Sequence, residues 1–250
     1  MKVILVGACG RMGKNVTELA AQTGVEIVCG VDLHPTSMPY PVYEHFSDIS
    51  EQADVIVDFS SADNLQERLA FCKERKLGIV LAATGFSQSD DALLLQYANS
   101  VPMFRTGNFS IGINLLQLLA KRAAAILGET FDVEIIERHH NQKKDAPSGT
   151  ALMLADSIRE AYDGKKENVY GRHGIVGARS KSEIGIHAVR GGTIVGEHEV
   201  MFAGEDEIIT LSHSARSRKV FAQGALRAAK WLIGRPNGIY DMNDLLNDII

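Results

Sequence analysis

The first 32 residues constrain the fold more than any other stretch, because they place a strand, a glycine turn, a helix and a second strand in order. Lys2 to Val6 (KVILV) is a continuous apolar run, as expected for a strand buried on both faces of a parallel sheet. Glycines at positions 7, 10 and 13 follow with the spacing G-x-x-G-x-x-G, and the helical stretch after them stops at Gly24. The second strand, 26–31, runs into Asp32.

This order is typical of a dinucleotide-binding unit. One glycine allows the tight turn, one lets the pyrophosphate approach backbone amides, and one lets the helix pack closely on the strand. Three glycines also occur by chance in ordinary turns. The flanking strand and helix, with an acid about 20 residues further on, favour the nucleotide interpretation.

Asp32 indicates which nicotinamide nucleotide binds. An acid at the end of the second strand can accept both ribose hydroxyls of the adenosine. Leu33 and His34 follow it, with no arginine or lysine to pair with a 2′-phosphate. We therefore expect NADH to be favoured over NADPH.

Strands and helices alternate up to about residue 105, which is the sequence form of a doubly wound α/β domain. Further strands are predicted at 53–59, 78–82 and 102–105. Ligands of such sheets lie at the carboxyl ends of the strands, so the loops that follow them should face the cofactor. We predict a Rossmann-like, doubly wound parallel sheet in a dinucleotide-binding domain over residues 1–110.

The pattern changes after residue 110. The sequence predicts a long apolar helix at 113–127, a strand at 131–137, a helix at 150–162 and a loop excursion at 163–182. Three closely spaced strands then follow, at 184–190, 197–202 and 207–213, and short turns between strands suggest a mixed or antiparallel sheet. We predict a second α+β domain over 111–216 for substrate binding and oligomerisation. Residues 217–250 should pack back on the first domain.

Composition excludes several classes of function. The net charge of −5 argues against nucleic acid or an anionic membrane as the main partner. Cysteines 9, 29 and 72 have no metal-like spacing, so we expect no metal site and a reduced, cytoplasmic setting. No signal peptide is expected, and no run approaches the roughly 20 apolar residues of a membrane span. The small second sheet would leave one face open, which predicts a homo-oligomer.

The densest group of ionisable residues is the run E-R-H-H-N-Q-K-K-D-A-P-S-G-T at 137–150. It lies between a predicted strand and a predicted helix. Ser148 or Thr150 can cap the helix, whose exposed amides would attract an anion. If a helical turn follows the strand, His139 and Lys143 share one face. Histidines 187, 198 and 213 lie on predicted strands and need no role.

This run closely resembles the signature E-x-H-H-x-x-K-x-D-A-P-S-G-T-A of the 4-hydroxy-tetrahydrodipicolinate reductase (dihydrodipicolinate reductase) family. The resemblance covers nearly the whole chain. The segment 7–13 looks like the nucleotide loop of the family, 108–112 looks like its interdomain segment, and 190–198 (RGGTIVGEH) also matches. Such enzymes reduce a cyclic, doubly carboxylated imine with NADH or NADPH on the diaminopimelate route to lysine.

The resemblance implies roles for individual residues. His139 would be the proton donor and acceptor and Lys143 the proton donor, while His140, Gly149 and Thr150 would bind the substrate. The implied nucleotide contacts are Gly7, Ala8, Cys9, Gly10, Arg11, Met12, Asp32, Ala82, Ala83, Thr84, Thr106, Gly107, Asn108 and Phe109. The family commonly has G-T-T at 82–84 and an alanine pair at 106–107, so side-chain contacts there are in doubt. It also implies a homotetramer built through the sheet of the second domain.

The residues fit this chemistry without the name. Hydride addition to a conjugated imine leaves an enamine that needs a proton, and histidine or a lysine of depressed pKa can supply it. Amides of Ser148, Gly149 and Thr150 suit one substrate carboxylate, and His140 or Lys144 the other. Asp145 is expected to orient Lys143 or brace the loop.

Two alternatives remain. Another two-domain dehydrogenase is possible, although a semialdehyde enzyme would need a cysteine nucleophile. A nucleotide-sensing regulator would lack the proton-donating cluster.

Overall fold

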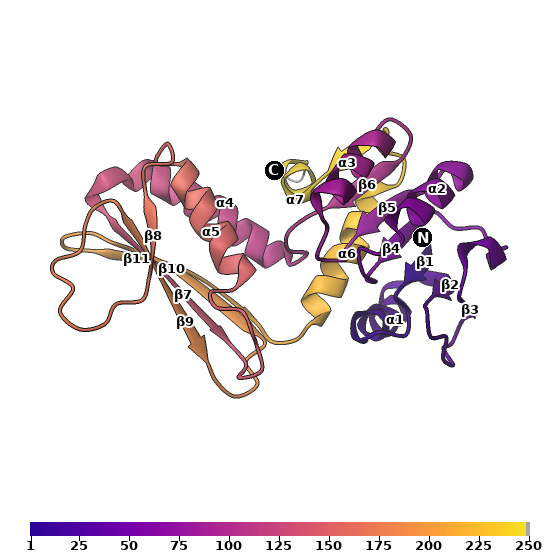
Figure 1. Cartoon of the computed structure of the whole chain (residues 1–250), viewed down its shortest axis with the longest axis horizontal. Helices are drawn as coiled ribbons and strands as arrows, with labels where there is room; N and C mark the ends of the chain where they lie inside the picture. Colours follow the sequence, from indigo (N-terminus) through magenta and orange to yellow (C-terminus); the bar gives the residue numbers. More distant parts are fainter. Residues whose placement is uncertain (249–250) are drawn as a thin grey trace. The chain divides into compact units, whose positions relative to one another are not determined.

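A computed structural model describes residues 1–248 of this 250-residue chain, which divide between two compact units. Unit 1 comprises Met1–Ser110 and the chain from Arg218 onward, and unit 2 comprises Ile111–Ser217 (Figure 1). Each unit has its own sheet and its own core, and each is described by itself.

Unit 1 is built on a seven-stranded parallel sheet in the order β12-β6-β5-β4-β1-β2-β3. Its strands are β1 (Lys2–Val6), β2 (Glu26–Val31), β3 (Val42–Tyr43), β4 (Val55–Asp58), β5 (Gly78–Leu81), β6 (Pro102–Arg105) and β12 (Gly238–Tyr240). Its helices are α1 (Arg11–Thr23), α2 (Leu65–Arg75), α3 (Gln88–Tyr97), α6 (Lys219–Leu232) and α7 (Met242–Asn247), with the short turn η1 (Phe46–Asp48). The predicted doubly wound fold is confirmed.

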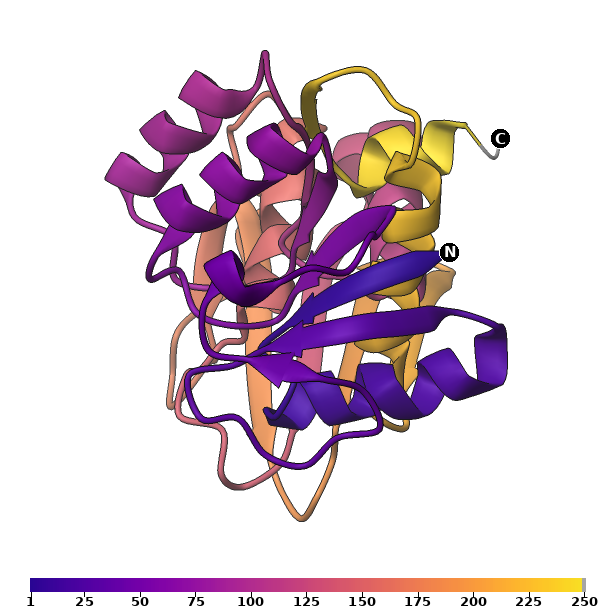
Figure 2. The ribbon, with the colours of Figure 1, turned by 90° about the vertical axis from the view of Figure 1, so that its right-hand side faces the viewer.

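Helices cover both faces of this sheet, which is why its central strands are apolar throughout. Every residue of β4 and β5 is buried. Helices α1 and α6 pack together on one face, and Figure 2 shows α2 and α3 on the opposite side from α1. A parallel sheet buried in this way requires continuous hydrophobic strands. The apolar run KVILV therefore correctly predicted a strand, β1, that is buried in a parallel sheet.

Unit 2 is built on a five-stranded mixed sheet in the order β11-β10-β7-β9-β8. Its strands are β7 (Asp132–His139), β8 (Glu167–Tyr170), β9 (Glu183–Arg190), β10 (Gly196–Ala203) and β11 (Ile208–Ala215). Its helices are α4 (Ile111–Leu127), followed by the short turn η2 (Gly128–Thr130), and α5 (Gly149–Glu160). β10 is antiparallel to β7 and β11, whereas β9 is parallel to β7 and β8.

Helices α4 and α5 lie on one face of the second sheet (Figure 1). Burial alternates strictly along β7 and β10, as it does when one face of a sheet packs on a core and the other does not. Ile113, Leu116 and Ala120 of α4 are buried in that core. By length and composition alone, α4 with η2 is long and apolar enough to cross a membrane, which for a single helix is weak evidence of a span. One face of α4 packs on the core of unit 2, whereas its side chains Leu115, Leu119 and Ile126 are exposed.

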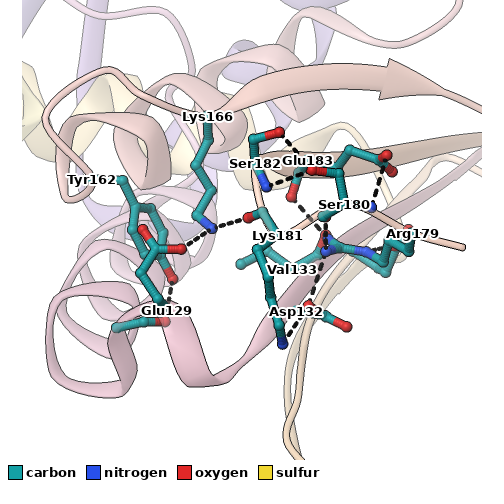
Figure 3. Close-up of polar contacts among 12 residues, drawn as sticks. Glu129, Asp132, Val133, Tyr162, Lys166, Arg179, Ser180, Lys181, Ser182 and Glu183 are labelled. Atoms are coloured by element: carbon teal, nitrogen blue, oxygen red, sulfur yellow. Dashed lines mark hydrogen bonds and ion pairs between the residues drawn. The ribbon is translucent and has the colours of Figure 1, made fainter.

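A buried lysine fastens the segment after α5 (Figure 3). Lys166 is 3% exposed, and its Nζ donates to Glu129 Oε2 at 2.9 Å and lies 4.2 Å from the Tyr162 ring centre. Arg179, further along the same connection, pairs with Asp132 on β7 and donates to backbone carbonyls of β7 and β9. These contacts hold the base of the loop between β8 and β9.

Three strands were missed from the sequence. β8 lies in the predicted loop excursion 163–182, β3 in a proline-rich loop, and β12 in the C-terminal tail. All three are edge strands of two to four residues, too short to show an alternating pattern. In the same tail, Asp241 caps α7 with a complete capping box.

Candidate active site

The site in unit 2 begins at the last residue of β7. The strand continues to His139, so Glu137 and His139, two residues apart, point to the same face of the sheet. That face is the one covered by helices. On it, the side chains of Glu137 and His139 follow the buried apolar residues Val133 and Ile135 along the strand. Glu137 is fully buried and His139 is 8% exposed.

Glu137 accepts hydrogen bonds through both carboxylate oxygens. Oε2 lies 2.6 Å from Nδ1 of His139 and accepts from Arg190 at 2.7 Å. Oε1 accepts from Arg190 at 2.7 Å and from the backbone N–H of Ser148 at 2.9 Å. Burial alone would raise the pKa of Glu137. The bonds from Arg190, His139 and Ser148 outweigh it and hold that pKa below its ordinary value. An ionised carboxylate only accepts, so Nδ1 of His139 carries the hydrogen.

Arg190, the last residue of β9, ties this pair to the loop before α5. Its second terminal nitrogen also donates to the carbonyl of Asp145 at 2.6 Å. The turn after β9 reinforces the end of β7, because Gly191 N–H donates to the carbonyl of His139 and Asn141 N–H to that of Gly192. The histidine therefore sits where three segments meet.

His198 on β10 forms the other wall of the site. Its ring stands at 75° to the ring of His139, with centres 5.2 Å apart. Its Nε2 lies 3.0 Å from the hydroxyl of Ser148, which caps α5 by accepting from Ala151 N–H. Burial, followed by the neighbouring His139, lowers the pKa of His198 to about 4. His198 is therefore a neutral hydrogen-bonding partner near pH 7, although the sequence suggested no role for it.

The segment between β7 and α5 corrects the prediction about His139 and Lys143. Residues 140–148 form turns, with Lys143 N–H donating to the carbonyl of His140, and no helical turn follows the strand. A shared helix face therefore does not bring the two side chains together. Lys143 Nζ instead pairs with Asp145 at 2.9 Å, and that bond lowers the pKa of Asp145. This contact is the one expected of Asp145.

The first turn of α5 supplies the anion-binding end of the site. Gly149 is exposed and Thr150 half-buried, and the first amides of a helix have no acceptor within it. A methyl group on Gly149 would meet no atom within 4 Å, so this surface is open. The amide of Ser148 must be removed from the predicted carboxylate donors, because it already donates to Glu137.

In unit 1 the predicted nucleotide residues gather at the carboxyl edge of the parallel sheet. They occupy the β1–α1 turn and first turn of α1 (Gly7, Ala8, Cys9, Gly10, Arg11, Met12), the end of β2 (Asp32), the loop after β5 (Ala82, Ala83, Thr84) and the loop after β6 (Thr106, Gly107, Asn108, Phe109). A cavity of about 300 Å³ lies at this edge, lined in part by Gly7, Gly10 and Asp32. Ligands of open α/β sheets bind at this edge.

The glycine turn fits a nucleotide. Gly7 has a φ of +74°, and a side chain there would lie 2.9 Å from the backbone of Phe59 and Ser60. A methyl group on Gly13 would lie 2.3 Å from the carbonyl oxygens of residues 7 and 8. Glycine at these positions keeps the turn tight and α1 close to β1, leaving backbone amides at the start of the helix for a pyrophosphate.

Acidic side chains line part of this cavity. Asp32 accepts from the backbone N–H groups of Cys9 and His34. Three further carboxylates (Glu44, Asp63 and Glu67) line the cavity. Arg68 also reaches it, but its guanidinium is paired with buried Asp58 at 3.0 Å and bonded to the β4–α2 turn. The lining of this cavity therefore includes four carboxylates and one arginine, which is already paired.

The side chain of Phe109 belongs to the core of unit 1. It is 6% exposed and packs against the rings of Phe59 and Phe104. Any nucleotide contact of Phe109 must therefore come from its backbone.

The sequence analysis missed three residues of the unit 2 site, namely Glu137, Arg190 and His198, as participants in their own right. One signal was available. A glutamate two positions before a histidine on an alternating strand shares its face, and a charged residue on a buried face requires partners. Arg190 and His198 gave no local signal, because they are about 50 residues from the groups they contact. The resemblance offered a second signal for them, because the matching segment 190–198 begins with Arg190 and ends with His198.

Comparisons with known proteins match the chain to two family models that meet near residue 110, and the second model also covers residues 218–246 of unit 1. Residues 1–109 match the family model described as dihydrodipicolinate reductase, N-terminus, and residues 112–246 match the one described as dihydrodipicolinate reductase, C-terminus. A 4-hydroxy-tetrahydrodipicolinate reductase of Caldanaerobacter subterraneus is 49% identical over 98% of both chains. One from Clostridium tetani is 45% identical, covering 99% of this chain and 97% of that relative.

Solved structures give the same picture. A dipicolinate-bound dihydrodipicolinate reductase from Paenisporosarcina sp. TG-14 superposes with a TM-score of 0.81 at 26% identity, covering 97% of this chain and 98% of that one. A probable dehydrogenase from Thermotoga maritima has a TM-score of 0.63 at 12% identity, covering 98% of this chain and 92% of that one, and shares the fold alone.

Proposed function

The chain belongs to the dihydrodipicolinate reductase family, and from this premise we propose that it reduces 4-hydroxy-tetrahydrodipicolinate to tetrahydrodipicolinate in lysine biosynthesis. The observation that carries the proposal is the arrangement around His139. A histidine held by a buried carboxylate stands beside the open first turn of a helix. This combination can bind a carboxylate and deliver a proton to the same small molecule.

The chemistry requires one hydride and one proton. After the 4-hydroxyl group leaves as water, a bound reduced nicotinamide supplies the hydride to the conjugated imine. The enamine that results takes a proton at carbon. We propose His139 as donor and acceptor of that proton and Lys143 as a second donor. The amides of Gly149 and Thr150 would hold one substrate carboxylate and His140 the other.

We infer that NADH is favoured over NADPH. Asp32 and the other carboxylates of the unit 1 cavity would repel a 2′-phosphate, and the one arginine lining it, Arg68, is already paired with Asp58. We expect kcat/KM for NADH to exceed that for NADPH about tenfold, which corresponds to about 1.4 kcal/mol. An equal or higher kcat/KM with NADPH would refute the preference without affecting the reaction.

We also propose a cytoplasmic homotetramer assembled through the face of the unit 2 sheet opposite α4 and α5. Two features support this assembly. That face has no helix of unit 2 on it (Figure 1), and the loop between β8 and β9 carries exposed Ile175 and Val176 above a base fixed by Arg179 (Figure 3). Exposed apolar loops beside an open sheet mark protein contacts. Sedimentation at several concentrations tests it, and a concentration-independent monomer would refute it.

The assay for activity is NADH oxidation with the condensation product of pyruvate and aspartate semialdehyde. His139→Ala and Lys143→Ala should each lower kcat by about 100-fold or more, as expected for loss of a general acid. Lys165→Ala, at an exposed lysine of the same unit with no assigned role, is the matched control and should keep the wild-type rate.

Absence of turnover in the wild-type protein would reject the proposed reaction and favour the nucleotide-sensing alternative. Full turnover in both alanine variants would reject the residue roles instead. A semialdehyde dehydrogenase is disfavoured, because Cys29 and Cys72 are fully buried and Cys9 lies in the nucleotide turn.

A further inference from the structure

We propose that Glu137, held in place by Arg190, is a positioning residue that fixes the tautomer of His139 and stabilises its protonated form. This inference rests on the proposed function, because it assigns His139 its proton through a second residue. The carboxylate is fully buried, lies 2.6 Å from Nδ1 of His139 and has no other imidazole among its bonded partners.

The partners of Glu137 leave a single arrangement of hydrogens. Arg190 donates to both carboxylate oxygens, and Ser148 N–H donates to Oε1. None of these groups can accept a hydrogen bond from Glu137, so a carboxylate is required and Nδ1 of His139 must donate to it. Nε2 is then the ring atom left to exchange a proton with the substrate.

The position of Nε2 is also defined. On the opposite side from Glu137, a methyl group on Gly196 would lie 3.1 Å from Nε2, so glycine there leaves room for this atom. The ring of His198 packs edge-on against His139 and completes its enclosure. The imidazole therefore has little freedom to turn while the bond to Glu137 holds.

The charges around His139 determine the direction of the effect. Glu137 contacts the ring of His139 from the same strand, Arg190 at the end of β9 contacts that carboxylate, and the ring of His198 on β10 packs against His139. The carboxylate of Glu137 is the group in hydrogen-bond contact with the ring. Because the positive charge of Arg190 remains nearby when this carboxylate is removed, its removal disfavours the imidazolium.

Glu137→Gln tests the role, because the amide has nearly the same shape but brings a donor into a site lined with donors. The least costly response is for Nδ1 to lose its hydrogen and accept, which moves the ring to the Nε2–H tautomer. We expect kcat to fall by roughly 10- to 100-fold, part of the effect of a general acid, with little change in substrate KM. The basic limb of the kcat–pH profile should move to lower pH.

Glu134→Gln is the matched control. Glu134 lies on the same strand and accepts from Arg172, Arg179 and His187, but on the opposite face of the sheet. The substitution Glu134→Gln also removes a carboxylate from a set of donors, but on the face away from His139. It should therefore leave the kcat–pH profile unchanged. If both variants changed the profile alike, the effect would be a general loss of stability and the proposal would fail.

Nitrogen-15 NMR of histidine-labelled protein separates this inference from the proposed reaction. His139, assigned with His139→Ala, should carry a hydrogen on Nδ1 in the wild type and lose it in Glu137→Gln. Glu137→Asp keeps a carboxylate as acceptor, so His139 should keep its Nδ1 hydrogen in this variant. It is the variant to measure if Glu137→Gln does not fold. A wild-type ring with Nδ1 unprotonated, or a folded glutamine variant with wild-type kcat and pH profile, would overturn the role. A wild type without turnover would reject the reaction, and the NMR result would still decide the tautomer.

Discussion

Buried His198 should make the protein lose stability as the pH falls from 7 to 5. Burial, and then His139, lower its pKa from 6.5 to about 4, so the folded protein keeps the ring neutral while the unfolded chain takes up a proton. The contribution of neutral His198 to the free energy of unfolding is fully present above pH 6.5 and is lost as the pH falls towards 4. The pKa difference between the unfolded and folded states corresponds to about 3 kcal/mol of stability, of which about 2 kcal/mol is lost between pH 7 and pH 5.

The assay is urea unfolding followed by far-ultraviolet circular dichroism at pH 7 and pH 5, at one protein concentration. His198→Gln can still bond to the Ser148 hydroxyl but does not titrate, so its loss of stability between the two pH values should be smaller by about 2 kcal/mol. His45→Gln, at an exposed position, should behave like the wild type. Equal losses in the wild type and His198→Gln would refute the reasoning, as would NMR titration of His198 near pH 6.5 in the folded protein.

Three further predictions concern packing and burial. Gly224→Ala should destabilise unit 1 by about 3 kcal/mol or more in urea unfolding, because the new methyl group would lie 1.7 Å from the carbonyl oxygen of residue 109, whereas Gly191→Ala should change stability by less than about 0.5 kcal/mol. Lys166→Met should lower the free energy of unfolding by about 1 to 2 kcal/mol, because the backbone carbonyl of Lys181 loses the hydrogen bond donated by buried Lys166. An unchanged unfolding midpoint would contradict this. Burial raises the pKa of Cys29 to about 12, so a thiol reagent at pH 8 should label Cys9 alone in the folded protein, and two rapidly reacting thiols would show that the buried ones are accessible.

The nucleotide-binding edge was predictable because its determinants are local. The strand, the three glycines, the helix and Asp32 lie within 32 residues, and each restricts the backbone through its own sterics or burial. The resemblance of residues 137–150 likewise identified the family, and these residues form the candidate site in unit 2. The structure contains both the predicted doubly wound sheet and the predicted mixed second sheet.

Local reasoning failed where a residue's role depends on a distant partner. A helical turn joining His139 to Lys143 was a plausible local choice, but the pairing of β7 with β9 and β10 keeps His139 in a strand. The edge strand β8 has no pattern of its own and exists because β9 offers unpaired backbone groups.

By itself, the sequence determined two sheets, a nucleotide turn and a cluster of proton-bearing side chains before a capped helix. Only the tertiary structure decided how that cluster is organised. Arg190 reaches Glu137 across 53 positions and His198 reaches Ser148 across 50, and both contacts exist because neighbouring strands bring their ends together. Burial at that junction then keeps His198 neutral and requires donors around Glu137, since a charge removed from water must be paired where it lies.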